Sequence, residues 1–110
     1  MSAHYFDTVQ GDHAVTVTLG YDRRLNYFHL TIERTTEPPA DVYQFVYCNL
    51  EDPELPRGQC ADLDYFRAKL RELGITIPES MFRETEQDSI NRVGNRAVRH
   101  QQDGTTTELA

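Results

Sequence analysis

Several side chains in this sequence could perform chemistry, but none stands in a recognised catalytic motif. Cys48, Ser80 and Ser89 carry possible nucleophiles, and His29 could act as a general acid or base near neutral pH. No GxSxG, HExxH, GxxxxGKS or CxxC…CxxC signature is present. The sequence therefore predicts no catalytic residue. A small enzyme that uses His29 or Cys48 in a cleft on an open sheet face stays open as the alternative.

The cysteines and histidines do not predict a metal site. The two cysteines, Cys48 and Cys60, are separated by an acidic, proline-containing loop, and a reducing compartment favours free thiols over a single disulfide. A zinc site would need further ligands from four histidines whose spacing matches no zinc motif: His4, His13, His29 and His100. We expect neither a metal nor a cofactor.

Acidic residues gather after the middle of the chain. Residues 51–64 contain five acids against one base, Arg57. Such a density of like charge could mimic the phosphates of nucleic acid or meet a basic protein, and it could equally be a solvated loop that leads into the N-terminus of a helix. Calcium binding is the weaker interpretation, because the acids lack the order of an EF-hand loop. The five acids are Glu51, Asp52, Glu54, Asp62 and Asp64.

Basic residues occur in two short runs. Arg23 and Arg24 lie beside Tyr21 and Tyr27 in an expected hairpin turn, where they could stack on bases or hold the carboxylates of a partner. A second run near the C-terminal end would share one face if a helix continued through it: Arg92, Arg96, Arg99 and His100. The net charge of −7 argues against nucleic-acid binding as the main role, and a nucleic-acid-binding accessory protein is kept as an alternative.

The elements that must position these groups follow from length and hydrophobic spacing. A chain of 110 residues with 38% hydrophobic residues suits one domain, which we expect to cover residues 1–100. Residues 101–110 offer little to bury and are predicted to be a disordered tail. No apolar run is long enough to span a bilayer and no secretory signal is visible, so a cytoplasmic location is expected.

The first half of the chain has the alternation typical of strands. Residues 14–19 and 27–34 alternate apolar and polar side chains, and they are predicted to form an antiparallel hairpin. Residues 41–48 are rich in β-branched and aromatic residues and predict a third strand with a central place in the sheet, while residues 5–9 predict a possible edge strand. The face away from the core would carry Thr16, Thr18, Tyr27, His29, Thr31 and Glu33.

The second half has helical spacing. Leu63, Phe66, Leu70 and Leu73 recur three and four residues apart and predict a helix over residues 61–73, which Gly74 would end. Pro78 suits the first turn of a second helix over residues 78–93. The fold class is therefore α+β: an antiparallel sheet of three to four strands, followed by two helices packed on one face.

Three stretches carry a resemblance to a known group of sequences. They are residues 19–25 (LGYDRRL), residues 62–75 (DLDYFRAKLRELGI) through Pro78, and residues 91–96 (NRVGNR). The pattern resembles short uncharacterised proteins carried by proteobacterial plasmids and integrative elements. The resemblance implies a context in which small acidic proteins often inhibit host defence, as anti-restriction and anti-CRISPR proteins do. It assigns no functional residue.

These observations together predict a small acidic protein-interaction module. Its partner would be a protein, in the sharper form a host complex that handles nucleic acid or provides defence. Direct nucleic-acid binding is not expected. The residues predicted to contact the partner are Arg23, Arg24, Tyr27, His29, Glu51, Asp52 and Glu54.

Overall fold

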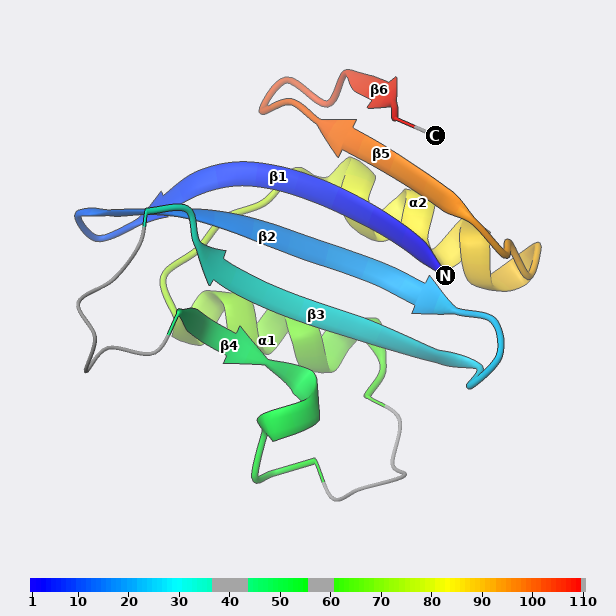
Figure 1. The fold of residues 1–110 in the computed structure, drawn as a ribbon, viewed down its shortest axis with the longest axis horizontal. Helices are drawn as coiled ribbons and strands as arrows, with labels where there is room; N and C mark the ends of the chain where they lie inside the picture. Colours follow the sequence, from blue (N-terminus) through cyan, green and yellow to red (C-terminus); the bar gives the residue numbers. More distant parts are fainter. Residues whose placement is uncertain (37–43, 56–60, 110) are drawn as a thin grey trace.

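Six β-strands form one mixed sheet in the order β4-β3-β2-β1-β5-β6 (Figure 1). The computed structural model describes residues 1–36, 44–55 and 61–109. The predicted α+β class is confirmed, but the prediction of three to four antiparallel strands is wrong, since the described sheet has six and one pair is parallel. The strands are β1 (Ser2–Gln10), β2 (His13–Asp22), β3 (Tyr27–Arg34), β4 (Phe45–Cys48), β5 (Arg96–His100) and β6 (Thr106–Glu108).

The hairpin of β2 and β3 forms as the alternation predicts. Val17 lies opposite Ile32 and Leu19 opposite Leu30, so these apolar side chains share the buried face. The turn is closed by the Asp22 carboxylate, whose Oδ1 atom accepts hydrogen bonds from the backbone N–H groups of Arg24 and Leu25.

Residues 5–9 were expected to form an edge strand. Strand β1 instead lies inside the sheet. It pairs with β2 on one side and in parallel with β5 on the other, with Ser2 opposite Arg96 and Tyr5 opposite Arg99. Strand β5 occupies the second basic run, so the helical continuation considered for those arginines does not occur. The sequence of this strand is mostly polar, since only Ala97 and Val98 in β5 are apolar, and it therefore gave no strand pattern.

Residues 101–109, expected to belong to a disordered tail, turn back along β5. His100 lies opposite Thr106 and Val98 opposite Glu108, which forms β6 at one edge of the sheet. An ion pair of 2.7 Å joins the Glu108 carboxylate to Arg96, and this bond across the two strands stabilises a segment that has almost no apolar surface.

The opposite edge of the described sheet is β4, which we had expected in a central position. Residues 41–43 of that predicted strand lie outside the described residues. After β4 the chain enters a short 3₁₀ turn, η1 (Asn49–Glu51), and the Asn49 side chain accepts a hydrogen bond from the backbone of Leu30. The Asn49 side chain thus serves as the hydrogen-bond acceptor for β3 at a point where β4 has already ended.

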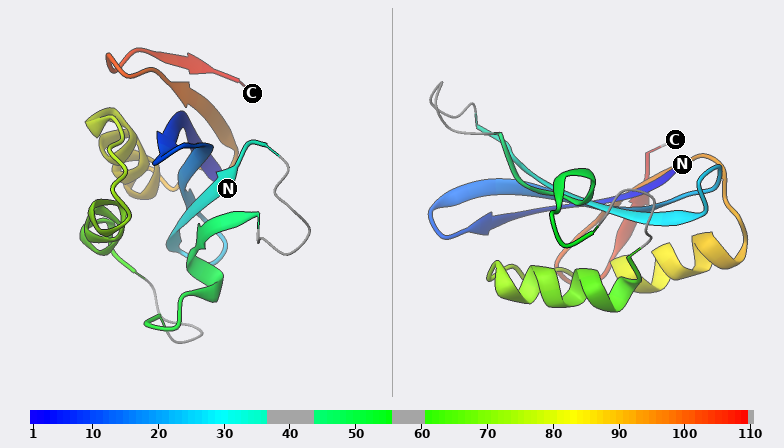
Figure 2. Two further views of the ribbon diagram at one scale, coloured as in Figure 1. Left: turned by 90° about the vertical axis from the view of Figure 1, so that its left-hand side faces the viewer. Right: turned by 90° about the horizontal axis from the view of Figure 1, so that it is seen from below.

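Both helices cover the same face of the sheet (Figure 2). Helix α1 (Leu63–Glu72) begins at Asp62, whose carboxylate accepts a hydrogen bond from the Tyr65 N–H, and ends at Gly74, which has a φ of 74°. Helix α2 (Glu79–Ile90) follows Pro78. No helix in the described ranges is long and apolar enough to cross a bilayer.

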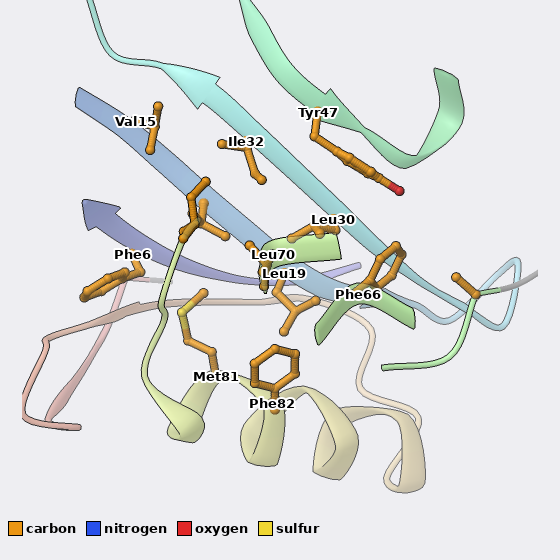
Figure 3. Close-up of a cluster of buried hydrophobic side chains, with 13 residues drawn as sticks. Phe6, Val15, Leu19, Leu30, Ile32, Tyr47, Phe66, Leu70, Met81 and Phe82 are labelled. Carbon is orange, nitrogen blue, oxygen red and sulfur yellow. The ribbon is translucent and has the colours of Figure 1, made fainter. Parts of the chain in front are cut away.

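The core lies between the helices and this covered face (Figure 3). Phe66 and Leu70 of the predicted stripe are buried, whereas Leu63 and Leu73 pack at its border. Met81 and Phe82 join them from α2, whereas Ile90 at the end of that helix is 64% exposed. The other members of the buried cluster are Phe6, Val15, Val17, Leu19, Leu30, Ile32, Tyr47, Ala61 and Ile75.

Candidate functional site

A chain of four polar side chains is buried where β1, β5 and α2 meet. The Oγ atom of Ser80 lies 2.9 Å from Nδ1 of His100, whose Nε2 atom lies 2.8 Å from Nδ1 of His4. Nε2 of His4 lies 2.6 Å from a carboxylate oxygen of Asp88. All four residues are at most 4% exposed. We call this chain the buried relay.

One set of tautomers satisfies every bond of the buried relay. Burial, and after it the charge of His4, lowers the pKa of His100 to about 4, so His100 is neutral at physiological pH. Ser80 O–H can then donate to His100, His100 Nε2–H to His4, and His4 Nε2–H to Asp88. The hydrogen bonds thus run in the order found at an activated serine: the hydroxyl donates to a base, and further groups orient that base.

Arg96 holds the carboxylate end of the relay. Its guanidinium contacts the second oxygen of Asp88 at 2.9 Å, Glu84 at 3.2 Å and Glu108 at 2.7 Å. Hydrogen bonds to these carboxylates, the one to Glu108 foremost, raise the pKa of Arg96 further above its ordinary value. Arg96 therefore ties α2, β5 and β6 together and compensates the buried negative charge.

An open groove of about 750 Å³ runs beside the relay. It lies at the C-terminal ends of the parallel strands β1 and β5, next to the start of α2, and His100 forms part of its wall together with Pro78. Its other walls are mostly polar and include Asp7, Thr76, Arg99, Gln101 and Gln102. Ser80 is not among the residues that line it, so the hydroxyl lies behind the groove wall.

The sequence pointed to only part of this network. Ser80 is one of the possible nucleophiles named from the sequence, and the structure places it beside His100. His4 and Asp88 were missed, because they lie 84 positions apart and no local pattern joins them. The available signal was the spacing of Ser80, Glu84 and Asp88, which places polar groups four residues apart on one side of α2.

The acidic loop is less free than its composition suggests. Asp52 is buried and accepts hydrogen bonds from the hydroxyls of Tyr47 at 2.7 Å and Tyr65 at 2.8 Å. Burial alone would raise the pKa of Asp52, but these bonds, the Glu54 N–H and the charge of Lys69 hold it below its ordinary value. Tyr65 in turn has its pKa raised to about 12, by burial and by this carboxylate.

Of the three predicted acidic contacts, two therefore remain at the surface. Glu51 and Glu54 are exposed, whereas Asp52 serves the packing of β4 on α1. Glu51 and Asp52 border a groove of about 270 Å³ between β4 and α1, to which Lys69 and Glu72 also belong. Arg57 and Cys60 lie outside the described residues, and Cys48 is a free thiol.

Arg23 and Arg24 lie together in the exposed turn between β2 and β3. They border a hollow of about 390 Å³ that also contains Met1, Asp22, Gly94 and Asn95. A Cβ atom added to Gly94 would lie only 3.0 Å from the guanidinium carbon of Arg23, so this guanidinium rests on the backbone of the turn between α2 and β5. We call the two turns and the hollow between them the basic end.

Tyr27 and His29 occupy a third place, the face that the helices leave uncovered. The His29 ring lies over Gly20 and its Nε2 atom is 3.0 Å from the carbonyl oxygen of Ser2. Burial lowers the pKa of His29 despite this hydrogen bond. The seven predicted contact residues are thus spread over the acidic loop, the β2–β3 turn and the uncovered face of β3, and Tyr27 adjoins that turn.

Three members of the second basic run, Arg96, Arg99 and His100, are engaged within the fold. Arg96 belongs to the relay, and Arg99 pairs with Asp7 at 2.6 Å beside the ring of Tyr5. No group of three or more potential metal ligands occurs among residues 1–36, 44–55 and 61–109.

No family model, curated protein or solved structure matches the chain. The resemblance to mobile-element proteins therefore stays a prediction.

Proposed function

We propose that this chain is a small interaction module that binds a protein partner by charge, with the basic end as its main contact. The observation that carries the proposal is the state of the arginines there. Within the described residues, Arg23, Arg24 and Arg92 form no ion pair, although the chain has 18 acids and 11 bases. Positive charge that a strongly acidic protein leaves unpaired on adjoining turns is suited to an external anion.

The surroundings of these arginines support a protein partner. Leu25 is 63% exposed in the same turn, and Met1 and Ile90 are similarly exposed beside the second turn. Apolar side chains next to arginines are typical of protein-binding surfaces, where arginine contributes both charge and packing. The acidic remainder of the protein would repel a long polyanion such as DNA.

The partner class follows from the resemblance described above. Small acidic proteins of mobile elements often inhibit host defence, so the sharper form of the proposal is an inhibitor of a host complex that handles nucleic acid. Under this proposal the exposed acids Glu51 and Glu54 provide a second contact, on a basic surface of the same complex.

A site-specific photo-crosslinker tests the proposal. A benzoylphenylalanine at position 25 is expected to capture one dominant host protein, and the Arg23→Glu/Arg24→Glu double variant is expected to abolish that capture. The matched control places the crosslinker at Leu50, which is also apolar and exposed but lies on η1. The captured protein is then purified and must bind the wild type and not the double variant. Capture that is insensitive to the charge reversal contradicts the proposal.

A second candidate function, a small hydrolase, is favoured by one observation. The Ser80–His100 contact of 2.9 Å continues through His4 to Asp88 beside the groove of about 750 Å³. The enzyme would use the relay and not the open sheet face. A fluorophosphonate probe tests it: Ser80 should be labelled, and Ser89, which is more exposed on the same helix but bonded only to the Glu86 carbonyl, should not. Absence of label at Ser80 removes this candidate.

A further inference from the structure

The two helices end in the same backbone motif but place different residues at its critical position. In α1 the N–H of Gly74 bonds to the carbonyl of Arg71 and that of Ile75 to Leu70. In α2 the N–H of Arg92 bonds to the carbonyl of Ser89 and that of Val93 to Asp88. Both are Schellman motifs, whose C′ residue takes a positive φ.

That position suits glycine, and α2 fills it with arginine. Gly74 has a φ of 74° and Arg92 a φ of 49°. A residue with a side chain is strained there, because its Cβ atom approaches the backbone, and such strain concentrates at sites of function. Among the described residues only Asn26 shares this feature, and asparagine tolerates it well.

Both non-glycine residues with a positive φ belong to the basic end. Asn26 lies in the turn that carries Arg23 and Arg24, and Arg92 lies two residues before Gly94, on whose backbone the Arg23 guanidinium rests. Two peptide units span at most about 7.6 Å, so Arg92 starts close enough for its long side chain to reach a ligand shared with Arg23. Among the described residues one carboxylate borders the hollow, that of Asp22, and its Oδ1 atom already accepts hydrogen bonds from two backbone N–H groups.

We infer that Arg92 is a third ligand-binding residue of the basic end, and that the three arginines bind the carboxylates of an acidic protein segment that also carries apolar side chains. This inference rests on the proposed function and specifies its partner. Arginine forks match carboxylates in a bidentate manner. The exposed Leu25 and Ile90 suit apolar residues interspersed among the acids. The net charge of −7 favours a short acidic segment over a nucleic-acid strand.

The internal comparison of the two helix ends supplies the experiment. Arg92→Gly relieves the strain and removes the ligand, so the melting temperature should rise by roughly 4 to 8 °C while affinity falls about tenfold. Gly74→Arg is the matched control at the end of α1: the melting temperature should fall and affinity should stay unchanged. The probe is a short fluorescein-labelled peptide of Asp, Glu, Leu and Phe, measured by fluorescence anisotropy.

The inference would be overturned by no binding of this peptide to the wild type, by equal affinity of the wild type and Arg92→Gly, or by tighter binding of a single-stranded DNA oligonucleotide than of the peptide. A matching peptide with Asn and Gln in place of the acids should not bind, and binding by it would overturn the carboxylate chemistry. If the peptide fails while the crosslink at position 25 still depends on Arg23 and Arg24, the interaction module stands and only its proposed ligand falls.

Discussion

Nδ1 of His4 and Nε2 of His100 lie 2.8 Å apart, so β1 and β5 share a buried hydrogen bond between two imidazole rings. The rings are 0% and 2% exposed, and no water can solvate a charge placed on them. Burial therefore disfavours the protonated form of His100 and lowers its pKa.

Stability should consequently fall in mild acid. The folded chain lowers the pKa of His100 to about 4, whereas an unfolded histidine titrates near about 6.5. Between these values the unfolded chain binds a proton that the folded chain does not. The contribution of His100 to the free energy of unfolding is therefore complete above about pH 6.5 and declines as the pH falls toward about 4. His29, whose pKa is also lowered by burial, acts in the same direction. Urea denaturation across this pH range measures the decline.

The control for this experiment is His13→Gln, which changes an exposed histidine and should leave the slope unaltered. His100→Gln should flatten the slope, although it also weakens the fold. A free energy of unfolding that does not change between pH 6.5 and pH 5 would contradict the prediction.

Removing the carboxylate of the buried relay should be costly. Asp88→Ala leaves both His4 and Arg96 without their shared partner in a site that water does not reach. We expect a loss of about 3 to 5 kcal/mol in the free energy of unfolding, as for other broken buried pairs. Glu86→Ala, at an exposed position on the same helix, should change it by less than about 0.5 kcal/mol. Equal effects of the two variants would show that the relay contributes nothing to stability.

Gly20 should not tolerate a side chain. An added Cβ atom would overlap the backbone carbonyl oxygen of Ser2 and lie 2.5 Å from Nε2 of His29. We expect Gly20→Ala to lower the free energy of unfolding by about 3 kcal/mol, the upper end of overpacking costs. The double variant with His29→Ala should be no better, because the clash with the Ser2 backbone remains. If His29→Ala restored stability, the His29 ring and not the Ser2 backbone would be what excludes the added Cβ atom. Thr18→Ala is the control on the same face.

The acidic loop should act on the rate at which a partner associates. Reversal of the exposed acids Glu51, Glu54 and Asp64 to Lys should slow association with a basic surface, and the effect should shrink as salt rises, since the Debye length falls from about 30 Å at 0.01 M to about 8 Å at physiological ionic strength. Asp52 is left unchanged because its burial makes it part of the core. Stopped-flow measurements with the purified crosslinked partner test this prediction.

The matched triple variant reverses acids that are exposed elsewhere, at Asp12, Glu86 and Asp103. It has the same net charge as the loop variant but should slow association less. If the two triple variants behave alike, the acidic loop is an ordinary solvated connection.

The sequence was informative where structure depends on neighbours along the chain. Helix α1 follows from the spacing of Phe66 and Leu70, and the β2–β3 hairpin from its alternation. Strand β5 could not be predicted in this way. Its inward side chains are Arg96, Val98 and His100, and two of them are polar groups that can be buried only because Asp88 and His4 meet them.

The same reason limits prediction of the sites. Arg23 and Arg24 could be placed in an exposed turn from turn chemistry alone. The burial of Asp52 could not be foreseen, because it requires Tyr47 from β4 and Tyr65 from α1 to converge on one carboxylate. The positive φ of Arg92 was equally hidden, since the residue type predicts an ordinary conformation there.

The parallel pairing of β1 with β5 also governs how the chain folds. Ser2 must find Arg96, and His4 must find His100 across 96 positions, whereas the β2–β3 hairpin and both helices need only local contacts. Closing so long a loop is entropically costly and the pairing raises the contact order, so we expect it to form late in folding. Interactions that form after the rate-limiting step act on the rate of unfolding. The buried relay is thus expected to slow unfolding, and so to lengthen the lifetime of the native state.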